Sequence, residues 1–136
     1  MNMKSIEAII ERASDGTYSV YCKDEMFNGM GDTPELAKQN MIEQIKFFRE
    51  TSIVDNYKYP TFLDAEYEII YKFDTQSLLE YYSGVITPAA LERLTGINKK
   101  QLWSYLHGRS KPRRTQIDKI EKPLHTLGNE LSSISL

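Results

Sequence analysis

The alternation of apolar and polar positions predicts a β-hairpin at the start of the chain. Residues 4–12 and 16–22 are both rich in residue types that favour strands, and the turn-forming sequence Ala-Ser-Asp-Gly at residues 13–16 separates them. A third short extended segment is expected around residues 26–30. Together these segments would form a small sheet.

A helical spacing of apolar residues follows the strands. Thr33 is a favoured N-cap residue, and Pro34 suits the first position of a helix. We therefore expect a helix that includes residues 35–49 and packs one face on the sheet. That face carries apolar residues at intervals of four, four and three: Ala37, Met41, Ile45 and Phe48.

The segment after this helix has no sustained period. Residues 51–65 contain Pro60, and a loop is predicted there. Residues 66–74 (Glu-Tyr-Glu-Ile-Ile-Tyr-Lys-Phe-Asp) return to a β-like pattern. The predicted order of the first half, residues 1–74, is therefore ββ(β)αβ.

Only helices are predicted in the second half, residues 75–136. Asp74 and Thr75 would cap a short helix over residues 76–83, which Gly84 would end. The predicted apolar face of this helix consists of Leu78, Leu79 and Tyr82.

A tight turn is expected between the next two helices. One would begin at Thr87 and Pro88 and end at Gly96, and the other would run from about Asn98 to His107. Gly96 tolerates the positive φ that such a turn requires. Apolar residues that could close a shared core are Leu91, Leu94, Ile97, Leu102, Tyr105 and Leu106.

The last helix would begin near Thr115. Its apolar residues recur at alternating steps of three and four, and Pro123 lies among them, so we expect a kink or a helix boundary there. The end of this stripe could join two copies of the chain or pack within one copy. The apolar residues are Ile117, Ile120, Leu124, Leu127, Leu131 and Ile134.

Charge is distributed unevenly, although the net charge is only −2. Residues 1–74 hold eight Lys/Arg and fourteen Asp/Glu, net −6, whereas residues 75–136 hold nine Lys/Arg and five Asp/Glu, net +4. A basic half suggests a nucleic-acid partner and an acidic half suggests a basic partner. A solvated surface is the alternative for each half.

The third helix of the second half is the candidate site. A helix-turn-helix that reads DNA needs a tight turn, an exposed face on its second helix and cations beside that face. Residues at the predicted outward positions are Lys99, Lys100, Trp103, Ser104 and His107. The cations that follow are Arg109, Lys111, Arg113 and Arg114. Trp103 would contact a thymine methyl group, a sugar or a partner subunit, unless the helix phase places it in the core.

Two short motifs flank the predicted outward face. Residues 91–98 read Leu-Glu-Arg-Leu-Thr-Gly-Ile-Asn, and residues 108–112 read Gly-Arg-Ser-Lys-Pro. They resemble the L-A-x-x-x-G-[IV]-[ST] turn and the G-x-x-x-P close of the Xre/Cro/phage-repressor family. Glu92 replaces the usual small residue, and Pro88 replaces a polar residue. The resemblance implies that the groove is faced by Asn98, Lys99, Lys100 and Ser104. It also implies that the phosphates are contacted by Arg109, Lys111, Arg113 and Arg114. A protein-interaction surface is the alternative.

Two further motifs occur in the first half. Residues 15–20 read Asp-Gly-Thr-Tyr-Ser-Val, and residues 31–37 read Gly-Asp-Thr-Pro-Glu-Leu-Ala. They resemble the D-G-x-[YF]-x-V and G-D-T-x-x-E-A motifs of the HicB antitoxin family, with Glu35 shifted by one place. The resemblance implies an α+β protein: a partial RNase H-like domain over residues 1–74, followed by a helix-turn-helix domain over residues 75–136.

Together the two resemblances imply a cytoplasmic type II antitoxin. It would bind a small, basic, HicA-like ribonuclease toxin and repress its own operon as a dimer or higher oligomer on operator DNA. The alternative is a free-standing transcriptional regulator whose first half senses a ligand.

No catalytic or cofactor pattern is recognisable. Cys22 is the only cysteine, and His107 and His125 have no neighbours with zinc-site spacing, so no metal is expected. The carboxylates of the first half offer no predicted pair for two-metal chemistry, and no Gly-rich phosphate loop is present. We expect a non-enzyme without cofactors. Apolar runs of three or four residues also predict no membrane segment.

Overall fold

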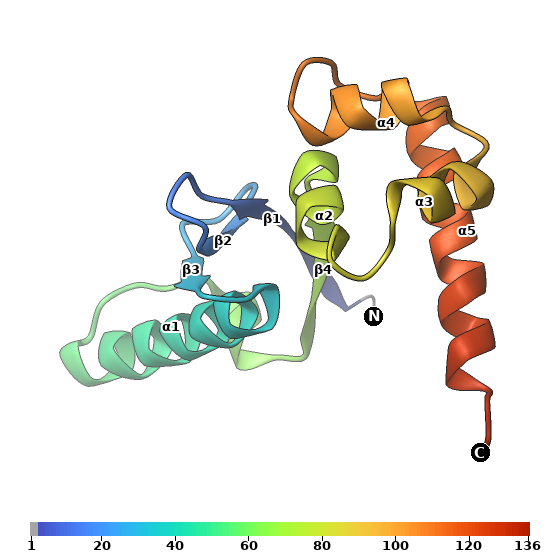
Figure 1. The fold of residues 1–136 in the computed structure, drawn as a ribbon. Coiled ribbons are helices and arrows are strands. Elements are labelled where there is room, and N and C mark those ends of the chain that lie inside the picture. Colours follow the sequence, from blue (N-terminus) through green and yellow to red (C-terminus); the bar gives the residue numbers. More distant parts are fainter. Residues whose placement is uncertain (1–2) are drawn as a thin grey trace. The chain divides into compact units, whose positions relative to one another are not determined.

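The computed structural model describes residues 3–136, and the chain divides into two compact units, Met1–Asp74 and Thr75–Leu136. The described residues contain one four-stranded mixed sheet and five α-helices, so the fold class is α+β (Figure 1). The sheet and the longest helix belong to the first unit, and the other four helices belong to the second.

The sheet of the first unit has the strand order β3-β2-β1-β4. Its strands are β1 (Lys4–Arg12), β2 (Tyr18–Cys22), β3 (Asn28–Gly31) and β4 (Tyr67–Phe73). The pairs β1–β2 and β2–β3 are antiparallel, whereas β4 lies parallel to β1. The predicted hairpin is confirmed, and the third strand begins slightly later than expected.

Helix α1 (Pro34–Asp55) packs against β2 and β3. The Thr33 hydroxyl accepts a hydrogen bond of 3.1 Å from the Leu36 N–H, so the predicted N-cap is confirmed. The side chains that α1 buries against the sheet include Ala37, Met41 and Ile45.

Gly29 lets α1 approach β3 closely. A Cβ atom at Gly29 would lie 2.4 Å from the backbone nitrogen of Met41 and 2.5 Å from the carbonyl oxygen of Ala37. Because real Cβ atoms do not approach backbone atoms so closely, any side chain at Gly29 would push α1 away from the sheet.

The loop predicted over residues 51–65 is wrong in two places. Helix α1 continues to Asp55, because Ser52 is on the buried face and is only 4% exposed. Asn56 then ends the helix in the left-handed conformation, with φ 58°. A 3₁₀ turn, η1 (Thr61–Asp64), follows and places Leu63 in the core.

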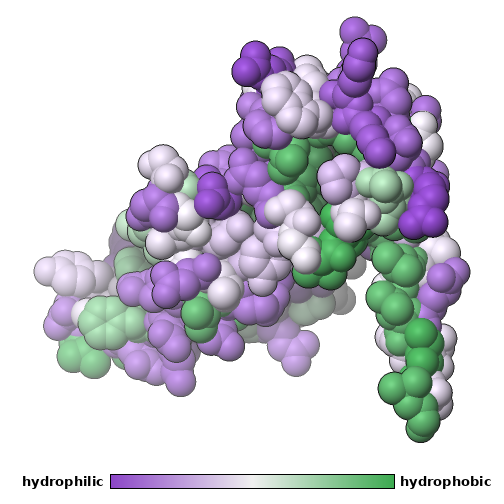
Figure 2. Space-filling model, viewed as in Figure 1, coloured by the Kyte–Doolittle hydropathy of each residue, from purple (hydrophilic) through white to green (hydrophobic). Residues whose placement is uncertain are grey.

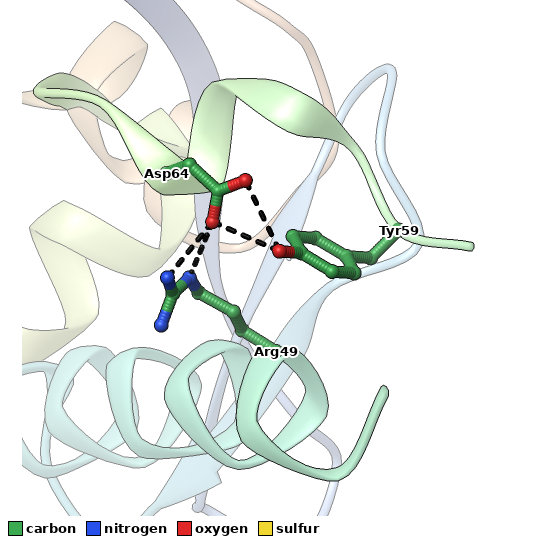
Figure 3. A network of polar contacts seen from close by, with 3 residues as sticks. All are labelled: Arg49, Tyr59 and Asp64. Carbon is green, nitrogen blue, oxygen red and sulfur yellow. Dashed lines mark hydrogen bonds and ion pairs between the residues drawn. The ribbon is translucent and has the colours of Figure 1, made fainter. Parts of the chain in front are cut away.

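A network of three side chains joins η1 to α1 (Figure 3). Arg49 donates to Asp64 Oδ1 from Nε at 2.9 Å and forms an ion pair with it at 2.8 Å. The Tyr59 hydroxyl donates to both carboxylate oxygens of Asp64 at 3.0 Å, and this hydrogen bonding raises the pKa of Tyr59. The network thus holds the segment that contains Tyr59 and η1, whose apolar residues have no regular spacing in the sequence, against α1.

The second unit consists of four helices around one small core. They are α2 (Thr75–Tyr82), α3 (Pro88–Thr95), α4 (Lys99–Leu106) and α5 (Arg114–Ser132). The buried core residues are Leu79, Ile97, Leu102, Tyr105 and Ile120, and the partly buried residues packed against them are Leu78, Leu91, Leu106 and Leu124. None of the helices in the described part of the chain is both long enough and apolar enough to cross a membrane.

One prediction about these helices is wrong, and one of two alternatives is excluded. Tyr82 does not lie on the buried face of α2: it is 41% exposed, whereas Ser77 and Leu79 are buried. At Pro123, where the sequence predicts a kink or a helix boundary, the boundary is excluded because α5 continues through this residue. Ile120 and Leu124, before and after Pro123, both pack on the core, and this packing offsets the one hydrogen bond that proline removes.

Candidate nucleic-acid interface

The turn between α3 and α4 is closed by local hydrogen bonds. Gly96 adopts the left-handed conformation, with φ 73°, and its N–H donates to the Glu92 carbonyl oxygen at 2.9 Å. Thr95 Oγ1 donates to the Leu91 carbonyl oxygen at 2.7 Å and accepts from the Ile97 N–H at 3.1 Å. Because Ile97 is buried at 5% exposure, this turn is fixed to the core of the unit.

Two side chains cap the first turn of α4, where backbone N–H groups have no partners within the helix. Asn98 Oδ1 accepts from the Gln101 N–H at 2.9 Å. The Glu92 carboxylate, which belongs to α3, accepts from the Lys99 N–H at 2.7 Å. Asn98, which the family resemblance places in the groove, is therefore also the N-cap residue of α4.

The exposed side of α4 carries Lys99, Lys100 and Trp103. Both lysines are exposed, and Trp103 is 49% exposed, so the alternative that places Trp103 in the core is wrong. Together with Ser104 these residues line a shallow, open hollow. Ser104 itself is half-buried, and its hydroxyl oxygen lies 2.7 Å from that of Ser110.

Trp103 is held by two neighbouring side chains. The rings of Trp103 and His107 stack with centroids 4.1 Å apart and an interplanar angle of 26°. The Arg109 guanidinium lies over the Trp103 ring, 5.2 Å from its centroid, which is a cation–π geometry. These contacts restrict the indole ring while about half of the residue stays accessible.

The segment after α4 is tied back to it. Gly108 has φ 68°, a backbone conformation that favours glycine. The Ser110 hydroxyl accepts from Gln101 Nε2 at 3.2 Å, in addition to its contact with Ser104. Sequence reasoning missed these roles of Gln101 and Ser110, because no local pattern pairs residues nine positions apart.

The four cations after α4 differ in their surroundings. Arg109 contacts Trp103, and Lys111 and Arg113 are exposed. Arg114 lies in the first turn of α5 and forms an ion pair of 3.1 Å with Asp118, which balances part of its charge. The structure thus brings Arg109 to the exposed side of α4 through its contact with Trp103, whereas Lys111 and Arg113 follow in the exposed segment before α5.

Acidic side chains of the first unit lie on the sheet face that points away from its core. Glu7 forms an ion pair of 3.1 Å with Lys72. Glu11 accepts a hydrogen bond of 2.8 Å from the Tyr21 hydroxyl, which raises the pKa of Tyr21. Glu68, at the β4 edge, is exposed. No three His, Cys, Asp or Glu side chains in residues 3–136 are grouped so that they could hold a metal ion.

Comparison with known protein families, with curated proteins and with solved structures finds no match to this chain.

Proposed function

We propose that the second unit binds double-stranded DNA as a helix-turn-helix domain, with α4 in the major groove. The observation that carries this proposal is the exposed set of Lys99, Lys100 and Trp103 on one side of α4. An α-helix fits the major groove, where base edges offer acceptors that lysine can contact. The turn at Gly96 and the caps at Asn98 and Glu92 fix the orientation of that helix.

Phosphate contacts would come from the segment that follows α4. Lys111 and Arg113 are exposed there, and the Ser110 hydrogen bonds hold the start of the segment beside α4. Cations beside the reading helix supply the part of DNA affinity that does not depend on sequence.

Removal of two charges from α4 tests the DNA-binding proposal. A duplex that the native chain selects from a random pool serves as the ligand. The double variant Lys99→Ala/Lys100→Ala should bind this duplex at least about tenfold more weakly than the native chain does, since each contact to a base or phosphate is worth about 1 kcal/mol or more. The matched control is Lys119→Ala/Lys122→Ala, which removes two exposed lysines from α5. Duplexes selected from a random pool and titrated at fixed salt provide the measurement. Equal affinities of the two variants would contradict the proposal.

We propose, second, that the first unit binds a small basic protein of the HicA toxin type, so that the whole chain acts as an antitoxin and represses its own operon. The resemblance of residues 15–20 and 31–37 to HicB motifs suggests this partner. The net charge of −6 on residues 1–74 supports it, because an acidic surface attracts a cationic partner and repels RNA.

Co-expression with the product of a neighbouring gene for a small basic protein tests this second proposal. The two proteins should co-purify, and Lys99→Ala/Lys100→Ala should leave that complex intact, because the lysines belong to the other unit. Failure to associate at low salt would favour the alternative, a transcriptional regulator whose first unit binds a small ligand.

We propose, third, that the DNA-binding form is a dimer. The predicted apolar stripe divides into two parts: Leu124 packs on the core, whereas Leu131 and Ile134 are 58% and 59% exposed. Ile134 lies beyond the end of α5 at Ser132, so the helical stripe ends earlier than predicted. Figure 2 shows hydrophobic residues gathered along the C-terminal part of α5. Helix-turn-helix dimers bind DNA sites that consist of two half-sites, and the recognition helix of each subunit reads one of them. Leu131→Asp/Ile134→Asp should yield a monomer in sedimentation experiments, and a monomeric native chain would contradict the proposal.

A further inference from the structure

The hollow on α4 combines an aromatic wall with two cationic groups. Lys99, Lys100, Trp103 and Ser104 line it. Each lysine offers hydrogen-bond donors and no acceptor, and the Ser104 hydroxyl is already engaged with Ser110. A group that fits here has an apolar part for the indole ring and an acceptor next to it.

Thymine is the base that presents both features in the major groove. Its C5-methyl group lies beside its O4 acceptor. Cytosine has no methyl group and directs its N4 donor toward the groove, where it would face an ammonium group. Adenine pairs an acceptor with a donor, and guanine offers two acceptors without an apolar group.

The indole ring is also positioned before DNA arrives. Its stack with His107 and its contact with the Arg109 guanidinium restrict its rotamers. An exposed aromatic group that is already ordered loses less conformational entropy on binding than a free one. The same two contacts leave Trp103 49% exposed, and Trp103 is one of the residues that line the hollow.

We propose that Trp103 determines specificity for a thymine, whose methyl group contacts the indole ring while its O4 accepts from Lys99 or Lys100. This inference rests on the proposed DNA-binding function and names the base that one position of the binding site must hold.

Base analogues in the selected duplex test the inference without changing the protein. Each thymine is replaced in turn by uracil, which removes only the methyl group. One position should bind about fourfold more weakly, the effect of removing one methyl-sized group from an apolar contact. At that position 5-methylcytosine should bind better than cytosine by a similar factor, because it restores the methyl group without O4.

Variants connect that methyl group to Trp103. In Trp103→Ala the uracil and thymine duplexes should bind equally, whereas Tyr82→Ala should retain the native difference. Tyr82 is the matched control because it is an exposed aromatic residue of the same unit that lies outside the hollow. The circular dichroism spectra of both variants establish that they are folded.

The outcomes separate the inference from the DNA-binding proposal. If uracil substitution has no effect at any thymine of a duplex that the native chain binds, the inference is overturned and the DNA-binding proposal stands. A methyl effect that persists in Trp103→Ala would overturn it too. No enrichment of any duplex by the native chain would contradict the DNA-binding proposal itself, and the inference would fail with it.

Discussion

The Glu92 carboxylate of α3 accepts a hydrogen bond of 2.7 Å from the backbone N–H of Lys99, the first residue of α4. From the proposed resemblance to the Xre/Cro family, a small residue would be expected at the position of Glu92. Here the longer side chain reaches across the turn to the helix N-terminus, where unpaired N–H groups and the helix dipole favour a negative charge. Glu92 therefore joins the two helices that flank the turn.

Loss of this cap should destabilise the second unit. Glu92→Ala removes the acceptor and should lower the free energy of unfolding by about 1 kcal/mol, which lowers Tm by roughly 4–8 °C in a domain of this size. The chain has a single tryptophan, Trp103, so its fluorescence follows the unfolding of this unit alone. Glu92→Gln keeps an acceptor oxygen and should lose less. If Glu92→Ala and the native chain have the same Tm, the Glu92–Lys99 hydrogen bond does not contribute to the stability of the second unit.

Salt dependence should separate phosphate contacts from base contacts. Lys111 is exposed in the segment after α4. If it neutralises one phosphate, Lys111→Ala should reduce the slope of log K against log salt by about 0.9. Affinity measured at four or five salt concentrations gives that slope. Lys119→Ala on α5 should leave the slope unchanged, and an unchanged slope in Lys111→Ala would exclude Lys111 from the interface.

A side chain at Gly29 should destabilise the first unit. The added Cβ of Gly29→Ala would lie 2.4 Å from Met41 N, so α1 must move, at an expected cost of about 1–3 kcal/mol or more. Cys22 is buried in this unit and burial raises the pKa of its thiol, so the rate of thiol labelling reports opening of the unit. Gly128→Ala is the control, because nothing lies within 4 Å of its added Cβ. Equal labelling rates in both variants would contradict the prediction.

Protonation of Asp15 should loosen the turn between β1 and β2. The Thr17 hydroxyl and backbone N–H donate to Asp15 Oδ1 at 2.6 and 2.9 Å, and these hydrogen bonds lower the pKa of Asp15 from its ordinary value of 3.8. Because the pKa of the folded form is the lower one, the carboxylate stabilises the turn fully above about pH 3.8. That stabilisation is lost as the pH falls through the pKa of the folded form.

An NMR titration of the Asp15 carboxyl group measures this shift directly. Thr17→Val removes the hydroxyl donor and should raise the pKa toward 3.8, whereas Thr17→Ser should keep it low. A pKa that is the same in all three chains would rule out the hydroxyl as its cause.

Short sequence patterns predicted the elements that depend on interactions between residues close in the sequence. The hairpin, the strand at residues 67–73 and the starts of three helices follow from strand-forming runs and from the N-caps Thr33, Thr87 and Asn98. Each N-cap residue bonds to an N–H three residues later, so the interaction is complete within one turn. The exposure of Lys99 and Lys100 also follows from helical periodicity, whereas the sequence left Trp103 open between the exposed side and the core.

The remaining features depend on residues that are distant in the sequence. The last turns of α1 were missed because residues 51–55 have no helical signal of their own, and their conformation depends on burial of Ser52 against the rest of the unit. Tyr82 could not be placed on the exposed side of α2 before α4 was known to pack on the opposite side, near Leu79.

Local sequence is enough to specify the order of the strands and α-helices, the N-caps Thr33, Thr87 and Asn98, and the exposure of Lys99 and Lys100, because each depends on neighbours within one or two turns. Long-range packing is needed to specify that β4 lies parallel to β1, that Ser110 bonds to Ser104 and Gln101, and that Glu92 caps α4. The Glu92 bond spans seven residues and the turn between α3 and α4. Its distance depends on how α3 and α4 pack around Ile97, and no local pattern contains that information.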